Sequence, residues 1–393
     1  MLFYSAFAVG ARDRDAGSCQ VAWSDHDKLK AMMHSNCPRA HWLDRLAPKL
    51  AAQWWRTALT AGEATPRPYV YFVVGANKGF EVASIYQRVA NASLTNQQWV
   101  QTLQSYGKRK KRKVYRDCGA VCNTCLDSPA RIAAPVAVSV HAFEMMRSNA
   151  DWLRFAFEVF GLSASTQLVE TVVSNRNGVA TVPNASAALM VGFERGVAAA
   201  GGHADSDGGS GVQSSRTTTL VPMVTLDHYM RERGIAHVNH VAIDAEGFDP
   251  LVIEGMQRSL GERRIDVLEF EYGSVGYWSE KQADKSLRAR TLEGTLSLLS
   301  GVGYTCFIQG NGGCIIPASG ACYVPALGAS HAWSNFVCAH GHGPNGGPAV
   351  ALWELSSEQL RQQQQRANSQ ADEHLGQRAH PAWCDLSSDP PRG

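Results

Sequence analysis

The segment Tyr69–Gly79, with the sequence YVYFVVGANKG, decides the fold. Its first six residues form a continuous β-branched and aromatic run, which is typical of a strand buried on both faces in a helix-covered parallel sheet. Gly75 ends this run, and the stretch from Gly79 to about Ala90 has helical character. A strand that passes through glycines into a helix predicts an α/β unit, in which the backbone approaches a ligand closely at the helix N-terminus.

Further strand and helix candidates alternate along the chain. The strand candidates are residues 136–142, 167–173, 238–243, 265–270 and 304–308, and the helix candidates are residues 145–159, 251–260 and 292–299. This alternation predicts an α/β fold with a mainly parallel sheet and helices on both of its faces.

The 393 residues divide into three expected parts. Residues 1–67 form an N-terminal lead segment that ends at closely spaced prolines, which stop a helix. Residues 68–325 form the α/β domain, with an insertion at about 91–135 and a glycine-rich, flexible loop at about 201–216. Residues 326–393 form a C-terminal extension with a low-complexity tail.

Charge and hydropathy exclude two classes of protein. There are 37 Lys and Arg against 35 Asp and Glu, a formal net charge of +2. No global excess of positive charge drives binding to a polyanion, so we expect no nucleic-acid partner. No apolar run approaches the roughly 18 residues that a membrane-spanning helix needs. Neither property decides the oligomeric state.

Three carboxylates follow predicted strands. Glu144 closes the second strand, where an acidic residue is placed to accept hydrogen bonds from ribose hydroxyls. Asp244 and Glu246 follow the strand at 238–243, at the sheet edge where open α/β folds bind ligands. Carboxylates are costly there unless they serve a ligand, a metal or a proton transfer. The alternatives are helix capping by Asp244 and a solvated Glu144 at a helix start.

Together these segments resemble the FkbM family of S-adenosylmethionine-dependent methyltransferases. The resemblance covers about residues 69–317 in consistent order. It is carried by Val74–Gly79, Ala142–Glu144, Val172–Gly178, Thr225–Asp227, Ile243–Asp249, Leu268–Tyr272 and Gly303–Phe307. The Asp-Ala-Glu-Gly-Phe block at 244–248 is the most diagnostic of these segments.

The resemblance implies a Rossmann-like, seven-stranded class I methyltransferase fold with S-adenosylmethionine as cofactor. Gly75, Ala76, Asn77 and Gly79 would line the methionine part of the cofactor, and Glu144 would hold its ribose. Asp244 and Glu246 match the family's motif after the fourth strand and would lie near the methyl group and the acceptor. Members of the family usually O-methylate hydroxyls on sugars, polyketides or other natural products, so the implied partner is a small-molecule or glycan acceptor.

An alcohol is a poor nucleophile, so a general base would accelerate its methylation by roughly 10²–10⁴-fold. The candidates are Asp244, Glu246, His228 and Glu271. Asp244 and Glu246 are favoured by position. His228 comes next, although its Thr-Leu-Asp-His setting is typical of a helix start, where a solvated histidine is favoured over a catalytic one. Glu271, at the end of the fifth strand, is placed to contact the acceptor.

One departure from the family concerns Val73. It stands where the family usually has an acidic residue that orients the glycine loop, the segment Gly75–Gly79. This keeps open a second interpretation, in which the chain is a degenerate binding module without productive cofactor binding. A nucleotide-dependent oxidoreductase is a third interpretation, which the absence of a G-x-G-x-x-G motif disfavours.

The ten cysteines leave the compartment open. Cys118, Cys122 and Cys125 are close in sequence, but structural zinc generally takes four ligands, so disulfides are at least as well supported and no metal site is predicted. A Golgi or secretory lumen suits the cysteines and two glycosylation-type triplets, whereas the cytosol suits the absence of a signal peptide.

Overall fold

A computed structural model describes residues 67–90, 92–110, 136–183, 218–273, 276–278, 290–309, 315–329 and 334–341, with Ala349 and Leu352. The lead segment up to residue 66, the cysteines at 118, 122 and 125, the loop at 201–216 and the low-complexity tail lie outside these residues.

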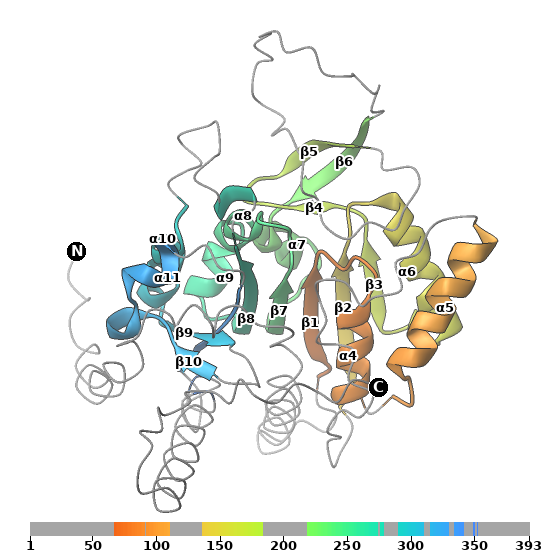
Figure 1. Cartoon of the computed structure of the whole chain (residues 1–393), viewed down its shortest axis with the longest axis horizontal. Helices are drawn as coiled ribbons and strands as arrows, with labels where there is room; N and C mark the ends of the chain where they lie inside the picture. The colour runs from red at the N-terminus through yellow and green to blue at the C-terminus, as the bar shows by residue number, and fades with distance from the viewer. Residues whose placement is uncertain are drawn as a thin grey trace, which may run out of the picture.

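The centre of the fold is an eight-stranded sheet with the order β10-β9-β11-β8-β7-β1-β2-β3 (Figure 1). Its strands are β1 (Tyr69–Val74), β2 (Val138–Phe143), β3 (Thr166–Val169), β7 (Val238–Ile243), β8 (Ile265–Tyr272), β9 (Tyr304–Gln309), β10 (Ile315–Pro317) and β11 (Ser334–His340). Strands β3, β2, β1, β7 and β8 are parallel, whereas β11 is antiparallel to both β8 and β9. The predicted α/β class with a mainly parallel sheet is confirmed. The predicted count of seven strands is not exact, because β10 adds a short antiparallel strand at the edge.

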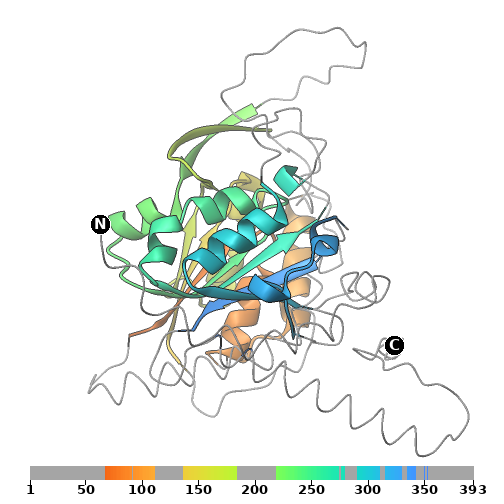
Figure 2. The ribbon, with the colours of Figure 1, turned by 90° about the vertical axis from the view of Figure 1, so that its left-hand side faces the viewer.

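Helices cover both faces of this sheet (Figure 2). The helices of one face are α4 (Phe80–Arg88), α5 (Asn96–Arg109) and α6 (Arg147–Val159); those of the other are α7 (Leu226–Glu232), α8 (Asp249–Glu254), α9 (Gln257–Gly261), α10 (Leu292–Gly301) and α11 (Pro325–Ala329). Strand β1 contributes to both hydrophobic cores, because alternate side chains point to opposite faces. Tyr71 and Val73 pack with α4 to α6, and Phe72 and Val74 pack on the other side.

A second, three-stranded sheet stands beside the carboxyl ends of the parallel strands (Figure 1). It contains β4 (Val172–Val173), β5 (Gly178–Pro183) and β6 (Thr218–Val224), in the order β4-β6-β5. The strand expected at 167–173 is therefore divided between two sheets. The division falls at Glu170 and Thr171, where the Thr171 hydroxyl donates to the carbonyl of Pro222 at 2.7 Å.

Among the elements that lie where none was expected, two change the expected bounds of the domain and its insertion. Helix α5 lies within the stretch taken as an insertion, and Thr95 begins it with a capping box in which Gln98 takes part. Strand β11 lies beyond residue 325, where the expected domain ended, and pairs with β8 and β9 inside the main sheet. The α/β unit therefore reaches at least to His340.

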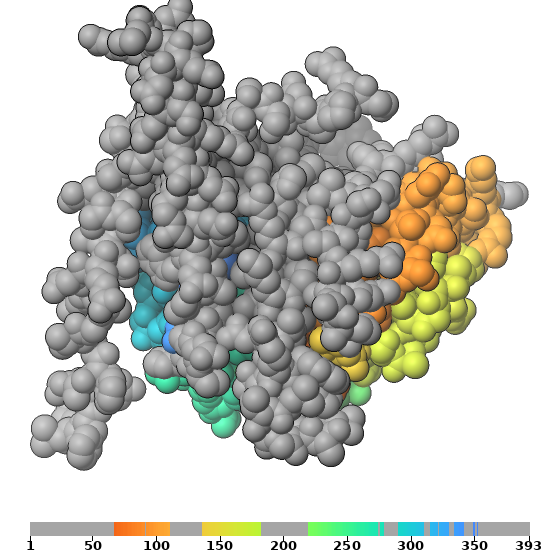
Figure 3. Space-filling view, turned by 90° about the horizontal axis from the view of Figure 1, so that it is seen from below, coloured from red at the N-terminus to blue at the C-terminus, as the bar shows by residue number. Residues whose placement is uncertain are grey.

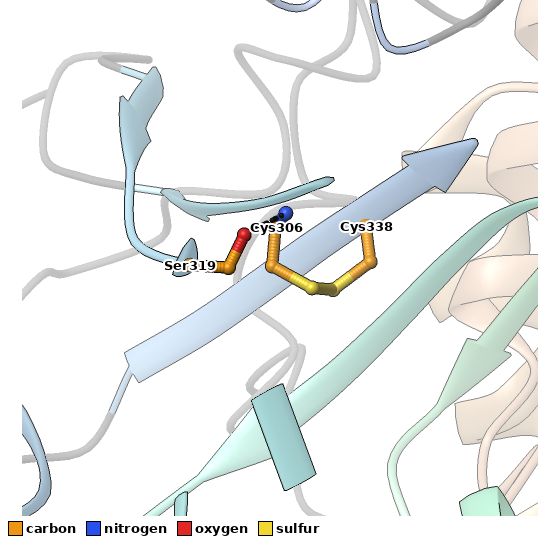
Figure 4. Close-up of a disulfide and its surroundings, with 3 residues drawn as sticks. All are labelled: Cys306, Ser319 and Cys338. Carbon is orange, nitrogen blue, oxygen red and sulfur yellow. Dashed lines mark hydrogen bonds between the residues drawn. A yellow bond between two sulfur atoms is a disulfide. The ribbon is translucent and has the colours of Figure 1, made fainter. Parts of the chain in front are cut away.

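A disulfide joins β9 and β11 through Cys306 and Cys338, which lie directly opposite each other (Figure 4). The backbone N–H of Cys306 donates to the Ser319 hydroxyl at 2.9 Å, so the same residue is fixed from both sides. Cys322 is also disulfide-bonded, and none of the cysteines that the structure describes is free. No helix within the described ranges is long and apolar enough to cross a bilayer.

Candidate functional site

The loop after β1 is inserted between the ends of β2 and β7. The N–H groups of Gly75 and Ala76 both donate to the carbonyl of Phe143, at 3.1 and 2.9 Å, and the N–H of Asp244 donates to the carbonyl of Val74 at 2.9 Å. Gly75 has a φ of 81°, and a Cβ there would lie 2.0 Å from the carbonyl oxygen of Asp244. Only glycine fits, because both the left-handed backbone and the close approach exclude a side chain.

Glu144 connects this loop to helix α6. Its Oε2 accepts the N–H of Asn77 and its Oε1 accepts the N–H of Met146, both at 2.7 Å. Burial raises the pKa of Glu144 to about 7, although these hydrogen bonds act in the opposite direction. Each carboxylate oxygen has a second lone pair, so Glu144 can hold the loop and still accept a hydrogen bond from a ligand.

The loop after β7 is fixed by Asp249, a fully buried carboxylate. Its Oδ2 accepts the N–H of Gly247 at 3.2 Å, and its Oδ1 accepts the N–H of Glu271 at 3.0 Å. Glu246 adopts a left-handed backbone, with a φ of 51°. The N–H of Tyr277 donates to the carbonyl of Gly247 at 2.8 Å. These bonds hold Asp244 and Glu246 at the edge of the sheet.

A pocket of about 800 Å³, which includes the part open to solvent, lies between these loops. Five predicted site residues line it: Gly75, Asn77, Glu144, Asp244 and Glu246. Its apolar wall includes Phe143, Met146, Val172, Val173 and Phe248. The topology explains this convergence, because the carboxyl ends of adjacent parallel strands meet at one edge of the sheet.

Four predicted site residues are absent from the lining. Ala76 is buried in the core beside α4, and Gly79 contacts Leu153 and Trp99. His228 lies in the first turn of α7, with its Nδ1 2.6 Å from a guanidinium nitrogen of Arg231. Glu271 is buried in β8 and joins the site through its backbone bond to Asp249.

The position of Val73 is settled by the packing of β1. Its side chain is 3% exposed and lies in the core formed with α4 to α6, on the face opposite the Val74 side chain. Val74 lines the pocket, and Val73 does not.

Asn149 is a lining residue that the sequence did not single out. It is buried in α6, and its Nδ2 donates to the Asn77 side chain at 3.4 Å. Within the described part of the chain, its Oδ1 has no hydrogen-bond partner although it is buried in the pocket wall. The available signal was its place in the first turn of the helix that follows β2, five residues after Glu144.

The electrostatics of the pocket favour a cationic or hydroxylated ligand. Its described lining contains three carboxylates and no lysine or arginine. The N–H groups of Gly75, Ala76, Asn77 and Gly79 all donate to protein acceptors. A pyrophosphate binds unpaired N–H groups at a helix N-terminus and is repelled by carboxylates, so this loop does not suit a dinucleotide. No group of three His, Cys, Asp or Glu side chains in the described ranges is arranged to hold a metal ion.

A comparison with known families matches the segment that contains strands β2 and β7 and the three carboxylates that follow them, Glu144, Asp244 and Glu246. Residues 134–304 match the sequence model of the methyltransferase FkbM domain. This segment is a methyltransferase FkbM domain. The predicted resemblance is thereby confirmed for the segment from β2 to the first residue of β9. Val74 and the glycine loop precede the matched residues, but hydrogen bonds join them to Phe143, Glu144 and Asp244 within the FkbM domain.

Two solved structures are similar to the chain at 9% sequence identity. The FkbM methyltransferase from Methylobacillus flagellatus KT aligns with 70% of this chain and 44% of its own length, with a TM-score of 0.32. This chain thus spans less than half of that protein. An O-methyltransferase from Bacillus cereus in complex with SAH aligns with 84% of this chain and 92% of its own, with a TM-score of 0.28. A comparison with curated protein sequences finds no match.

Proposed function

We propose that this chain is an S-adenosylmethionine-dependent methyltransferase that O-methylates a hydroxyl group on a sugar, a glycan or another natural product. The observation that carries the proposal is the convergence of Glu144, Asp244 and Glu246 on one pocket of an FkbM domain. The described lining adds no basic residue to these three carboxylates.

The residues of the pocket fit the chemical groups of this cofactor. The carboxylates complement a sulfonium and an ammonium group, and Glu144 keeps lone pairs for ribose hydroxyls. Phe143, Met146 and Val172 form an apolar wall that suits an adenine ring. The buried Oδ1 of Asn149 is an acceptor for an amino group of the ligand. This donor and acceptor set also argues against the oxidoreductase interpretation, because it offers nothing to a pyrophosphate.

Asp244 and Glu246 supply the acid–base part of the reaction. When bound, S-adenosylmethionine supplies an activated methyl group, which the acceptor oxygen takes as the sulfur–carbon bond breaks. The acceptor proton passes to one of the two carboxylates, which helps by roughly 10²–10⁴-fold. The other residues of the pocket orient the acceptor and exclude water. Two weaker candidates for the base lie outside the described pocket lining. They are His228, whose ring lies beside Arg231, and Glu271, which is buried in β8.

A binding module without catalysis is the second candidate, and Val73 is the observation that favours it. Val73 is packed in the core and gives no carboxylate to the loop. If the loop needs that carboxylate, cofactor binding fails even though Glu144, Asp244 and Glu246 are in place.

Calorimetric titration of the purified chain with S-adenosylmethionine and S-adenosylhomocysteine tests the proposal. We expect micromolar binding that Glu144→Ala abolishes and that Glu158→Ala, an exposed acidic residue on α6, leaves unchanged. Circular dichroism of each variant checks that it is folded. A folded wild-type chain that gives no heat at high ligand concentration would refute the enzyme proposal and favour the binding module.

The base is tested separately, with hydroxylated glycans and lipids screened as acceptors. Asp244→Asn and Glu246→Gln should still bind S-adenosylhomocysteine, while one of them lowers methyl transfer by roughly 10²–10⁴-fold. If both variants turn over at the wild-type rate, neither carboxylate is the base.

A further inference from the structure

Two tryptophan side chains donate to the same backbone carbonyl of the glycine loop. Nε1 of Trp99 and Nε1 of Trp152 each lie 2.9 Å from the carbonyl oxygen of Lys78. Both side chains are fully buried. A carbonyl oxygen has two lone pairs, so these two indoles use its whole acceptor capacity.

The two donors come from different helices that meet beside the loop. Trp99 lies on α5 and Trp152 on α6, and the two ring systems pack edge to face with centroids 5.7 Å apart. In Figure 3 the residues that include α5 (orange) lie directly against those that include α6 (yellow). Phe160 stacks on Trp99 at 5.1 Å and Tyr106 packs on Trp152 at 5.7 Å, so neighbouring rings fix both indoles.

The loop is seated directly on these rings. A Cβ at Gly79 would lie 2.8 Å from Cζ2 of Trp99 and 2.5 Å from the Leu153 side chain. Asn77 and Gly79, on either side of Lys78, both have positive φ values of 46° and 76°. Asparagine adopts this conformation more readily than most non-glycine residues, and at Asn77 the surroundings fix it. Glu144 holds the N–H of Asn77, and the indoles hold the next carbonyl.

We propose that Trp99 and Trp152 are positioning residues that hold the glycine loop in its ligand-binding conformation before any ligand arrives. This inference rests on the proposed function, because it assigns a role in cofactor binding to side chains that do not line the pocket. The inference also assigns a role to α5, the helix that lies between the loop and β2 in sequence. Its first turns supply one of the two donors to the loop.

Hydrogen exchange of the ligand-free protein tests this inference without any turnover. In Trp99→Phe and Trp152→Phe, which keep an aromatic ring but lose the donor, amides of residues 75–80 should exchange roughly tenfold faster, and the double variant faster still. The affinity for S-adenosylhomocysteine should fall by a similar factor. Leu162→Ala, in the same core but away from the loop, is the control for general destabilisation.

A second replacement separates the hydrogen bond from the shape of the ring. Trp99 replaced by β-(3-benzothienyl)alanine keeps the bicyclic shape but has no N–H. We expect this variant to match Trp99→Phe in exchange and in affinity. Wild-type behaviour of this variant would overturn the inference, as would unchanged loop exchange in the double variant or equal acceleration in Leu162→Ala.

The two proposals fail in different ways. If the wild-type chain binds no S-adenosylhomocysteine, the proposed function fails, and the exchange of the ligand-free loop still decides whether the indoles hold it. If the wild type binds the ligand but the tryptophan variants leave loop exchange and affinity unchanged, only the positioning role is lost.

Discussion

Replacing Gly75 with alanine tests whether the contact between the loops after β1 and β7 builds the pocket. The new Cβ would lie 2.0 Å from the carbonyl oxygen of Asp244 and 2.9 Å from its carbonyl carbon. Ordinary contact begins at 3.4 Å, so one loop must retreat by about 1.4 Å. That movement breaks the hydrogen bond from the N–H of Asp244 to Val74, and it shifts Asp244 within the pocket.

The cost has two parts that a matched control separates. A left-handed alanine costs roughly 1–2 kcal/mol, and the lost hydrogen bond adds about 1 kcal/mol, before any displacement of buried strands. Gly161 has a similar φ of 67°, and a Cβ added there would meet nothing within 4 Å, so Gly161→Ala has the backbone cost alone. We expect a loss of unfolding free energy of about 1–2 kcal/mol for Gly161→Ala and of at least about 3 kcal/mol for Gly75→Ala.

Thermal unfolding measures this difference. For a folded domain of roughly 150–250 residues, 1 kcal/mol corresponds to roughly 2–4 °C in Tm, so Gly161→Ala should lower Tm by about 2–8 °C and Gly75→Ala by at least about 6 °C. Titration with S-adenosylhomocysteine should show wild-type affinity for Gly161→Ala and at least a tenfold loss for Gly75→Ala. Equal Tm shifts, or wild-type affinity in Gly75→Ala, would show that the loops adapt and that the contact does not define the pocket.

Three further predictions concern buried groups. The folded-state pKa of Glu144 is about 7, above its unfolded value of 4.5, so the stability that it contributes is full below pH 4.5 and is lost as the pH rises to about 7. Urea unfolding of the wild type should therefore show a loss of unfolding free energy of up to about 3 kcal/mol over this pH range. Glu144→Gln should not show this loss. Joint replacement of Cys306 and Cys338 by alanine should cost roughly 3–4 kcal/mol, from the 32-residue separation that the disulfide closes, and a mass unchanged by reductant would contradict the bond itself. Asp249→Asn loses one of the two acceptor contacts described above and should lower stability by about 1–3 kcal/mol; unchanged urea midpoints would show that the loop after β7 does not depend on it.

The sequence predicted the parallel part of the sheet well, because its strands are buried on both faces and appear as unbroken apolar runs. Strand β11 could not be found in this way. Its seven residues, SNFVCAH, mix polar and apolar side chains, yet all are buried. The polar ones are accommodated only by tertiary partners, such as Asp266, which lies 3.2 Å from the His340 ring. In β6, Pro222 interrupts the strand pattern.

The candidate site was predictable where it lies at strand ends. Glu144, Asp244 and Glu246 each follow a predicted parallel strand, and the carboxyl ends of such strands meet at one edge of the sheet. The order of elements along the chain was therefore enough to predict that these residues lie close together. Asn149, Asp249 and the two indoles at Lys78 are different. Their roles depend on tertiary contacts that residue type alone does not mark, although Asn149 stands in the helix after β2 and Asp249 ends the Ile243–Asp249 segment. His228 has the chemistry of a base but lies outside the described pocket lining, so its role as a base stays a prediction.

The place of β11 in the sheet has a consequence for synthesis on the ribosome. The strands β3, β2, β1, β7 and β8 emerge first, so the part of the sheet that carries the pocket can pair while the chain is still growing. Strand β9 emerges next, but its link to β8 is β11, which follows later. A nascent chain whose emerged part ends between Gln309 and Ser334 therefore presents the unpaired edges of β8 and β9, which are templates for pairing with other chains. Demand for chaperones should peak in that interval and end when His340 leaves the exit tunnel.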